Sequence, residues 1–400
     1  MSHSDYVIEV VNSPLDIGAA DWNQLLALQP DASPFMRHEY LAAMHESRSA
    51  VPKTGWTPRF VTLWRPNTAS GGGRELWGAC ALYLKDHSYG EYVFDHAWAN
   101  AYHQHGLPYY PKALVAPPFT PVPGARLLAR DDTTRRALAT ALTQWCMQAG
   151  LSSLHVLFAS EADVAACAAA GMMLRHNVQF HWTNRVPGYR DFDDFLDSLS
   201  QDKRKKIRQE RRKVAQAGVT FHASVGDRIC AAEWDFFYRC YERTYYEHGN
   251  APYLSRDFFH RMARDMANNW LLFVGERAGR PIAASLIVLN DPGAGAAAAR
   301  VAYGRYWGAL ERVDCLHFEA CYYQPLQWCI AQGYQRFEGG AQGEHKMARA
   351  LLPVKTTSAH WLAHPSFADA VEKFLRREGD GIDNYMEQLE QRNPFKGAPG

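Results

Sequence analysis

The chain has 400 residues, 47% of them hydrophobic and 21% charged, with a formal net charge of +1. This composition is typical of a globular protein, and the length corresponds to two or more domains or to one large two-lobed unit. The nearly neutral balance gives no overall attraction to nucleic acid or to an anionic membrane, so any such partner must bind a local patch.

The eight cysteines form no Cys-x-x-Cys pair, and several lie in apolar helical contexts. This pattern indicates reduced, buried cysteines and excludes a disulfide framework or a zinc site. His103 and His105 have no third ligand nearby in the sequence, so no metal site is expected. The N-terminus lacks the regions of a signal peptide, and the longest apolar run, Ile282–Leu289, is too short to span a bilayer. We therefore expect a cytoplasmic protein without a transmembrane segment and without DNA as a partner.

The first half of the chain alternates between predicted strands and helices. Apolar alternation indicates strands, while residues such as Asp21, Pro34 and Gly150 mark the ends of helices. The expected strands cover residues 6–11, 59–64, 75–84, 93–98, 112–116 and 153–158. The expected helices cover residues 21–28, 34–44, 131–149 and 161–170.

The second half follows the same scheme and ends in an amphipathic tail. Its expected strands cover residues 179–183, 219–223, 270–276, 281–290, 300–307 and 335–338. Its expected helices cover residues 192–199, 203–217, 234–246, 255–266, 318–330 and 365–390.

A short internal repeat links the two halves. The segment Trp77–Leu84 resembles Pro281–Val288, and each is followed by a stretch with aromatic residues that we expect to form a strand. A duplicated unit would explain this similarity, with the halves meeting near residue 175, although so short a match is also compatible with coincidence. We therefore predict an α/β protein of mixed sheets, with an N-terminal domain at residues 1–175 and a C-terminal domain at residues 176–400.

The predicted helix at residues 203–217 is strongly basic, with eight Lys or Arg residues among eleven. Such a density favours binding of phosphate, on a nucleotide-linked sugar, a tRNA backbone or a lipid head group. The competing interpretation is a solvated helix, although like charges at this density cost stability unless something neutralises them. The expected phosphate-binding residues are Lys203, Arg204, Lys206 and Arg208.

Three residues of the predicted strand 300–307 alternate along the chain. Tyr303, Arg305 and Trp307 would share one face of the sheet and could line a substrate pocket. The competing interpretation is an arginine paired with an acid on an ordinary sheet.

The stretch Phe337–Lys346 holds the densest mix of glycines, titratable groups and β-forming residues in the chain. Its glycines leave the backbone open to close approach by a ligand. Gln342, His345 and Lys346 would then stand at the mouth of a cleft, and the expected substrate-binding residues are Gln342, Gly343 and Lys346. The competing interpretation is a Gly-rich turn between a strand and a surface loop.

These motifs resemble the FemAB-like proteins of bacteria, which are associated with peptidoglycan biosynthesis or recognition and belong to the GNAT-like acyl-CoA N-acyltransferase superfamily. The resemblance extends from Ser33 to Pro394. Its most specific segments are Leu199–Arg208, His248–Leu254, and Phe337–Lys346 with Pro353 and His360-Trp361. It implies two tandem GNAT-like domains, acyl or aminoacyl transfer to an amine, and a substrate-binding role for His248.

One segment departs from the pattern of acetyl-CoA-binding GNAT enzymes. Those enzymes hold a pyrophosphate in a Gly-rich loop at a helix N-terminus. The corresponding Gly308–Cys315 has no such loop and carries Glu311 and Asp314, which would repel phosphates. Fem transferases use an aminoacyl-tRNA donor, which fits the missing loop better. No cofactor is therefore assigned, and acyl-CoA and aminoacyl-tRNA are the candidate donors.

Acylation of an amine requires removal of a proton and stabilisation of an oxyanion. Glu338 or His345 would accept the proton, while Lys346 or a backbone N–H would hold the oxyanion; each side chain could equally be a structural hydrogen-bonding group. The sequence thus predicts an N-acyltransferase that acts on a small or cell-wall-related acceptor. Two alternatives stay open: a non-catalytic protein that recognises a phosphorylated peptidoglycan precursor, and a conventional CoA-dependent N-acetyltransferase.

Overall fold

The computed structural model describes residues 6–66, 73–291, 299–341 and 343–396. The chain forms two compact units, Met1–Asn177 with Lys355–Asp383, and Val178–Val354 with Asn384–Gly400. The predicted division at residue 175 therefore misplaced Lys355–Asp383, which returns to the first unit. The physical reason is apolar burial, because Val371 and Leu375 of the tail helix pack in one cluster with Trp98 and Tyr102.

The first unit contains both helices and strands. Its helices are α1 (Ala19–Ala27), α2 (His38–Glu46), α3 (His96–Gln104), α4 (Asp132–Gln148), α5 (Glu161–Ala169) and most of α12 (Pro365–Glu390), with short 3₁₀ turns at Pro14–Asp16, Pro34–Met36 and Pro52–Thr54. Its strands are β1 (Val7–Val11), β2 (Trp56–Pro58), β3 (Phe60–Pro66), β4 (Arg74–Cys80), β5 (Leu82–Lys85), β6 (Lys112–Val115), β7 (Leu128–Ala129), β8 (Ser153–Val156) and parts of β9 (Met173–Thr183) and β15 (Leu352–Leu362).

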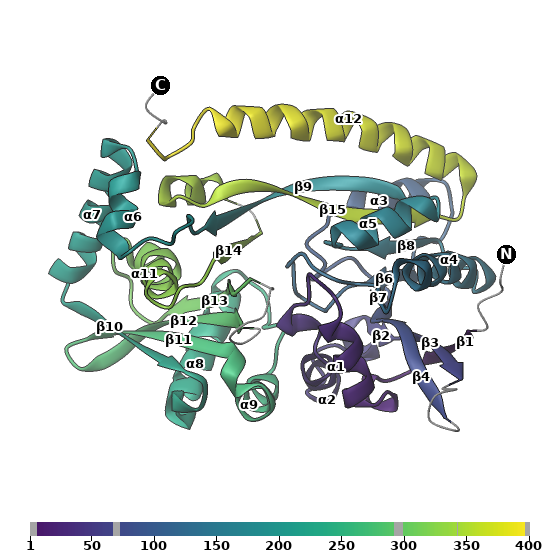
Figure 1. Cartoon of the computed structure of the whole chain (residues 1–400), viewed down its shortest axis with the longest axis horizontal. Helices are drawn as coiled ribbons and strands as arrows, with labels where there is room; N and C mark the ends of the chain where they lie inside the picture. Colours follow the sequence, from purple (N-terminus) through teal and green to yellow (C-terminus); the bar gives the residue numbers. More distant parts are fainter. Residues whose placement is uncertain (1–5, 67–72, 292–298, 342, 397–400) are drawn as a thin grey trace. The chain divides into compact units, whose positions relative to one another are not determined.

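The second unit is a mixed sheet with helices on both faces. Its helices are α6 (Phe192–Ser198), α7 (Gln201–Gln216), α8 (Ala231–Glu247), α9 (Arg256–Asp265), α10 (Leu316–Phe318), the π-helix η6 (Glu319–Tyr323) and α11 (Gln324–Ala331), with 3₁₀ helices at Gly226–Arg228, Ala267–Asn269 and η7 (Glu344–Arg349). Its strands are β10 (Val219–Val225), β11 (Trp270–Arg277), β12 (Arg280–Asn290), β13 (Val301–Ala309), β14 (Arg336–Ala341) and the end of β9. Figure 1 shows α8 and α9 on one side of this sheet and α11 on the other.

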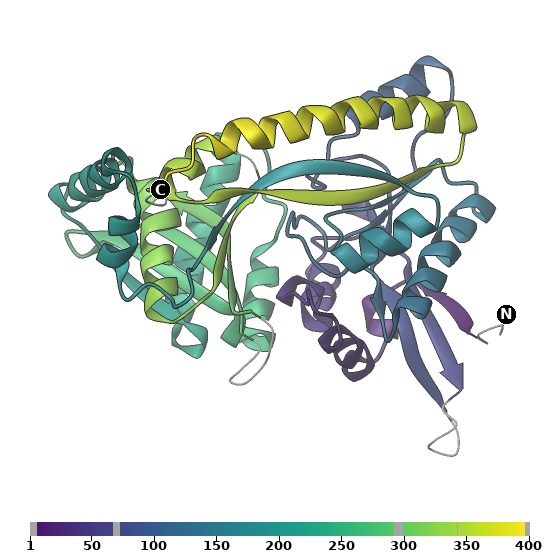
Figure 2. The same ribbon diagram turned by 45° about the horizontal axis from the view of Figure 1, so that its top comes forward.

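The two units repeat one pattern of strand pairing. In the second unit β10, β11, β12 and β13 pair antiparallel in sequence, β13 pairs parallel with β14, and β14 pairs antiparallel with β9. In the first unit β1 pairs antiparallel with β3, and β3 with β4. There β5 pairs antiparallel with β6, β6 pairs parallel with β8, and β8 pairs antiparallel with β15. The repeat predicted from Trp77–Leu84 and Pro281–Val288 therefore falls on equivalent strands. The chain enters the second unit through β9 and leaves it through β15 (Figure 2).

The apolar alternation of the strands explains the core of the second unit. Leu271, Phe273 and Ile287 lie in one buried cluster with Leu326 and Cys329 of α11. On the other face, the Trp270 ring packs edge-on against Trp234 of α8, with ring centroids 5.9 Å apart. Alternate residues of one strand thus pack against the helices on opposite faces, as expected for a sheet that is covered on both faces.

Several local expectations are corrected by the structure. Residues 93–98 were expected to form a strand, but Asp95 precedes α3, whose buried Trp98 and Tyr102 are spaced for a helix. Asp21 does not cap α1, because that helix begins at Ala19 and Asp21 lies in its first turn. By contrast, the helix expected at residues 255–266 is confirmed as α9, which begins where the Ser255 hydroxyl accepts a hydrogen bond from the Phe258 N–H. All eight cysteines are free, with Cys230 exposed and Cys315 and Cys321 partly buried.

Gly308 allows α8 to lie directly against β13. A Cβ atom at this position would lie 1.9 Å from the carbonyl oxygen of Cys240, a contact that requires backbone movement. We expect Gly308→Ala to lower the free energy of unfolding by about 2–3 kcal/mol, as overpacking of a core does. Urea denaturation measures this change.

The matched control is Gly381→Ala in α12, where a Cβ atom meets nothing within 4 Å. That variant is expected to gain about 0.5–1 kcal/mol from the higher helix propensity of alanine. Equal effects at the two positions would contradict the close approach at Gly308.

Candidate active site

The parallel strands β13 and β14 separate part-way along their length. Their pairing covers Val301–Tyr303 against Arg336–Glu338 and ends there. At the same level, the register between β12 and β13 shifts so that Leu286 faces Tyr306 and Ile287 faces Gly304, which leaves Arg305 as a β-bulge. The separation therefore opens the sheet beside the Gly-rich stretch.

A cavity of about 110 Å³ lies at this separation. Three strands and one helix supply its walls: β12, β13 and β14, and the continuous α10–η6 helix. The lining residues are Ser285, Gly304, Arg305, Tyr306, Trp307, His317, Cys321, Tyr322, Phe337 and Gly339. Gly304 keeps β13 close to the ring of Phe337, because a Cβ atom there would lie 3.0 Å from its Cζ. A π-helix at the wall is also a feature that is frequent at functional sites.

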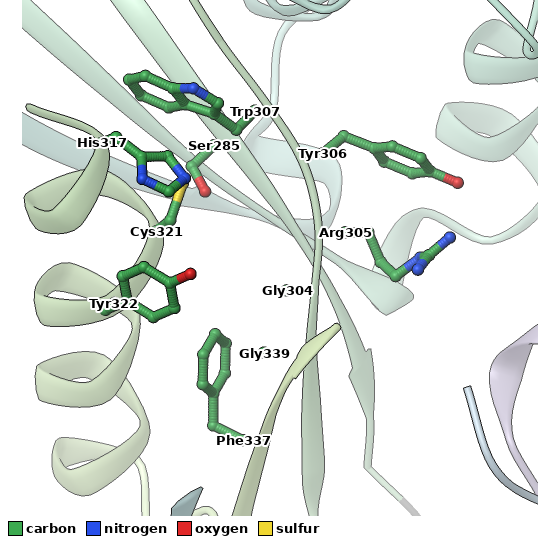
Figure 3. Close-up of a pocket in the computed structure, with 10 residues that line it drawn as sticks. All are labelled: Ser285, Gly304, Arg305, Tyr306, Trp307, His317, Cys321, Tyr322, Phe337 and Gly339. Atoms are coloured by element: carbon green, nitrogen blue, oxygen red, sulfur yellow. The ribbon is translucent and has the colours of Figure 1, made fainter. Parts of the chain in front are cut away.

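The bulge changes which side chains of β13 share a face. Figure 3 shows Trp307 pointing toward His317, whereas Arg305 and Tyr306 lie on the opposite side of the strand. The guanidinium of Arg305 lies 5.2 Å from the centre of the Tyr306 ring. The prediction that Tyr303, Arg305 and Trp307 share one face is therefore wrong, because the extra residue of the bulge breaks the alternation.

His345 contacts Tyr322, a residue of the cavity wall. Its Nε2 lies 3.2 Å from the hydroxyl of Tyr322. Burial, followed by the positive charges of Arg349 and Lys346, lowers the pKa of His345 below its ordinary value. Within the wall, burial lowers the pKa of His317 to about 4. Both imidazoles are therefore neutral at pH 7, and a neutral imidazole can accept a proton.

Lys346 lies next to Gly339 of the cavity wall and is 3% exposed. A Cβ atom on Gly339 would lie 3.4 Å from its Cδ, and its Nζ donates a hydrogen bond of 2.8 Å to the carbonyl oxygen of Gly340. Burial lowers the pKa of Lys346 to about 8. Gly343 immediately precedes η7, the short helix that carries Lys346, and has a φ of 112°, a conformation that favours glycine. Gln342 lies outside the described residues.

Glu338 lies on the other face of the sheet from the cavity, because it alternates with Phe337 and Gly339 along β14. It is 3% exposed, and its carboxylate lies 2.9 Å from Arg336 Nε and 3.8 Å from His181 Nε2. Tyr303 is its register partner on β13. The predicted residues therefore divide into two sets, one with His345 and Lys346 beside the cavity and one with Glu338 and Tyr303 on the opposite face.

His248 lies away from both sets. It is exposed at the C-terminal end of α8, where its Nδ1 lies 2.6 Å from the carbonyl oxygen of Thr244. It does not line the cavity at Gly304 and Gly339.

The basic helix α7 presents several charged faces. Ile207, Glu210 and Val214 form its buried side. Arg204 and Arg208 line a groove of about 500 Å³ together with Gln201, Lys205, Gln209 and Arg212. Lys203 and Lys206 are not among the residues that line this groove.

Acidic residues on α6 lie close to two of the predicted phosphate-binding arginines. Arg204 lies 3.4 Å from Asp197, and Arg208 lies 3.5 Å from Asp193. Exposed pairs of this kind contribute little to stability, so the arginines stay available to an anionic ligand.

Sequence reasoning missed the polar groups of α10–η6 and their partners. Cys321 and Tyr322 fall within the helix expected at residues 318–330 and were given no role there, although Tyr322 meets His345. Glu210 lies within the expected basic helix and Arg349 outside every expected element, and neither was given a role. No local pattern could have paired them, because 139 residues separate them in the chain.

Two features are absent from the residues that the structure describes. Across the described ranges no helix combines the length and the apolar character needed to cross a membrane. In the same ranges no group of three or more His, Cys, Asp or Glu side chains could hold a metal ion.

Comparisons with known proteins agree with the tandem arrangement. The structure of FemX matches with 11% identity and a TM-score of 0.50 over 89% of this chain and 98% of that one. The structure of L-PGS from Bacillus licheniformis matches with 11% identity and a TM-score of 0.52 over 92% of this chain and 99% of that one. At this identity the likeness concerns the fold alone, and the predicted α/β fold of two tandem units is confirmed. No curated protein matches the chain. A family model described as peptidoglycan biosynthesis/recognition matches residues 13–397, and the chain therefore belongs to the FemAB-like family, as its motifs predict.

Proposed function

We propose that the second unit transfers an acyl or aminoacyl group to the amine of a cell-wall-related acceptor. The observation that carries this proposal is the separation of β13 from β14 beside a neutral imidazole and a buried lysine. The family assignment supports an acyltransferase of peptidoglycan metabolism. Open α/β sheets also bind ligands where strand ends diverge, which supports the same place.

In this proposal His345 is the general base. An amine attacks only as the free base, and its proton passes through the Tyr322 hydroxyl to His345 Nε2, which lies 3.2 Å from that hydroxyl. Tyr322 lines the cavity, so its hydroxyl would connect the amine to the imidazole. The Lys346 ammonium and the β13 amides beyond Tyr303 would stabilise the oxyanion of the tetrahedral intermediate. Glu338, on the opposite face, is the alternative base.

The proposed donor is an aminoacyl-tRNA, with acyl-CoA as the competing donor. Glu311 in the segment Gly308–Cys315 pairs with Arg277, and Asp314 lies 3.4 Å from Lys213, so acidic groups stand where a CoA pyrophosphate would bind. The phosphates would bind instead along α7, through Lys203, Arg204, Lys206 and Arg208. A cytoplasmic location belongs to this proposal, because aminoacyl-tRNA is made there.

The groove on α7 favours a second candidate, a non-catalytic protein that binds a phosphorylated peptidoglycan precursor. Its volume of about 500 Å³ falls within the roughly 300–1,000 Å³ of ordinary ligand pockets, and Arg204 and Arg208 line it, whereas the cavity beside β13 has only about 110 Å³. Such a protein would bind the same acceptor without forming a product.

A transfer assay with the full chain separates the two candidates. The chain is incubated with mixed aminoacyl-tRNAs or with acyl-CoA esters, and with a UDP-linked muropeptide that carries a free amine. Mass spectrometry then detects the new amide. We expect product with the wild type. With Tyr322→Phe the rate of product formation should fall at least about tenfold, because the hydroxyl that is hydrogen-bonded to His345 is lost. Binding of the muropeptide without product from any donor would favour the binding protein.

The matched control is Tyr238→Phe on α8. Tyr238 packs on Phe259, with ring centroids 6.0 Å apart, and does not line the cavity. Its hydroxyl is therefore expected to be dispensable. An equal loss of activity in both variants would contradict the role of Tyr322.

A further inference from the structure

A buried ion pair joins the basic helix α7 to the turn that carries His345. Glu210 of α7 is 8% exposed, and Arg349 at the end of η7 is 2% exposed. The Nη2 group of Arg349 donates to both carboxylate oxygens of Glu210, at 3.1 and 3.0 Å. The Tyr323 hydroxyl donates to the same carboxylate. Both charged groups are therefore desolvated and held in one geometry.

Arg349 extends this contact to His345. Its Nη1 group donates a hydrogen bond of 2.7 Å to the carbonyl oxygen of His345. Its guanidinium also lies on the ring of Phe318, with Cζ 3.4 Å from the ring centre. One side chain thus contacts α7, α10 and the backbone of His345 at once.

We propose that Glu210 and Arg349 are positioning residues for His345: the pair fixes the backbone of η7 so that the imidazole meets Tyr322. This inference rests on the proposed function for its kinetic consequences, but not for its geometry. It also links the phosphate-binding face of α7 to the proposed base, because Glu210 lies on the same helix as Arg204 and Arg208.

A packing role would not require these residue types. Replacing a buried ion pair by apolar residues of similar volume is often neutral or stabilising, because the charges no longer need to be desolvated. An apolar pair could therefore join α7 to η7 equally well. Unlike an apolar pair, the ion pair includes Arg349, which donates a hydrogen bond to the His345 carbonyl and places a positive charge near the His345 imidazole.

The imidazole is surrounded by a defined set of polar and charged groups. Tyr322 and His317 lie on the α10–η6 segment, and Lys346 and Arg349 lie on η7 itself. Neighbouring Glu344 is engaged by Tyr385 and Arg392. Arg349 is, after burial, the largest cause that lowers the pKa of His345.

The two members of the pair therefore have opposite electrostatic effects on His345. In Arg349→Gln a positive charge is removed, so the protonated imidazole is less disfavoured and the pKa of His345 rises. In Glu210→Gln the arginine keeps its charge and loses its counter-ion, so the same pKa falls or stays unchanged. General loss of structure would not move the two variants in opposite directions.

The experiment titrates the His345 ring in the full chain by NMR, with ¹³C-labelled histidine and His345→Ala to assign its signal. For Arg349→Gln we expect the titration midpoint to move up by about half a pH unit, and for Glu210→Gln to move down or stay in place. In transfer assays, kcat of Arg349→Gln should fall about tenfold with KM little changed, and the acid limb of its pH profile should move up. Arg349→Lys keeps the charge and should stay close to the wild-type midpoint.

The matched control is Arg300→Gln in the same unit. Arg300 makes contacts of the same three kinds, with the carboxylate of Asp291, the carbonyl oxygen of Gln332 and the ring of Tyr334. Its loss should leave the His345 midpoint unchanged. A wild-type midpoint in both Arg349→Gln and Glu210→Gln would overturn the proposal. If the wild type yields no product with any donor while the midpoints still move in opposite directions, the proposed function fails and the positioning role stands.

Discussion

Replacing His345 by Ala is expected to lower kcat for amine acylation about a hundredfold while the chain stays folded, because a positioned general base is lost. His345 is exposed, so its removal opens no cavity in the core. Partial burial and two neighbouring cations lower the pKa of His345, so the wild-type rate should rise with pH below neutrality and level off as the pH approaches neutrality. The variant should lose this acid limb. Product formation measured from pH 5 to 8 checks both expectations.

The control for His345→Ala is His260→Ala on α9. His260 is an exposed histidine that lies 3.6 Å from Asp235 and does not line the cavity. Glu338→Gln tests the alternative base on the opposite face of the sheet. If kcat falls about a hundredfold in Glu338→Gln and is unchanged in His345→Ala, the chemistry takes place on that face. If neither variant changes the rate, the second unit does not use these residues for proton transfer.

Charge reversal of Arg204 and Arg208 together is expected to weaken the binding of an anionic donor and to flatten its salt dependence. Each phosphate contact that is lost should lower the slope of log affinity against log salt by about one. Both side chains line one groove of α7, so the double variant should lose two contacts. Fluorescence anisotropy with labelled tRNA, between low and physiological salt, measures affinity and slope together.

The matched double variant reverses Arg261 and Arg264 on α9. These arginines also lie close to acids of their own helix, Asp257 and Asp265, and α9 has only one more arginine than it has acidic residues. Reversal of Lys203 and Lys206 tests whether residues outside the groove contribute. Unchanged affinity of the Arg204/Arg208 variant at low salt would remove α7 from the binding site.

Much of the secondary structure followed from periodicity in the sequence. The strands β11 and β12 and the helices α7 and α9 depend on contacts between residues close in the chain, which a local pattern can report. The repeat and the family resemblance likewise depended on short motifs such as Trp77–Leu84 and Phe337–Lys346. The error at residues 93–98 arose because a short aromatic segment suits either a strand or a helix, and packing against Val371 and Leu375 decides between them.

The candidate site was only partly predictable. The sequence by itself determined that glycines, His345 and Lys346 follow a strand, and that α7 is basic. The tertiary structure decided which of these residues meet: a single bulge at Arg305 moved Trp307 to the other face, and strand alternation placed Glu338 away from the cavity. It also paired Glu210 with Arg349 across 139 residues. The physical reason is that register, bulges and buried ion pairs depend on which distant elements pack together, and no spacing along one segment carries that information.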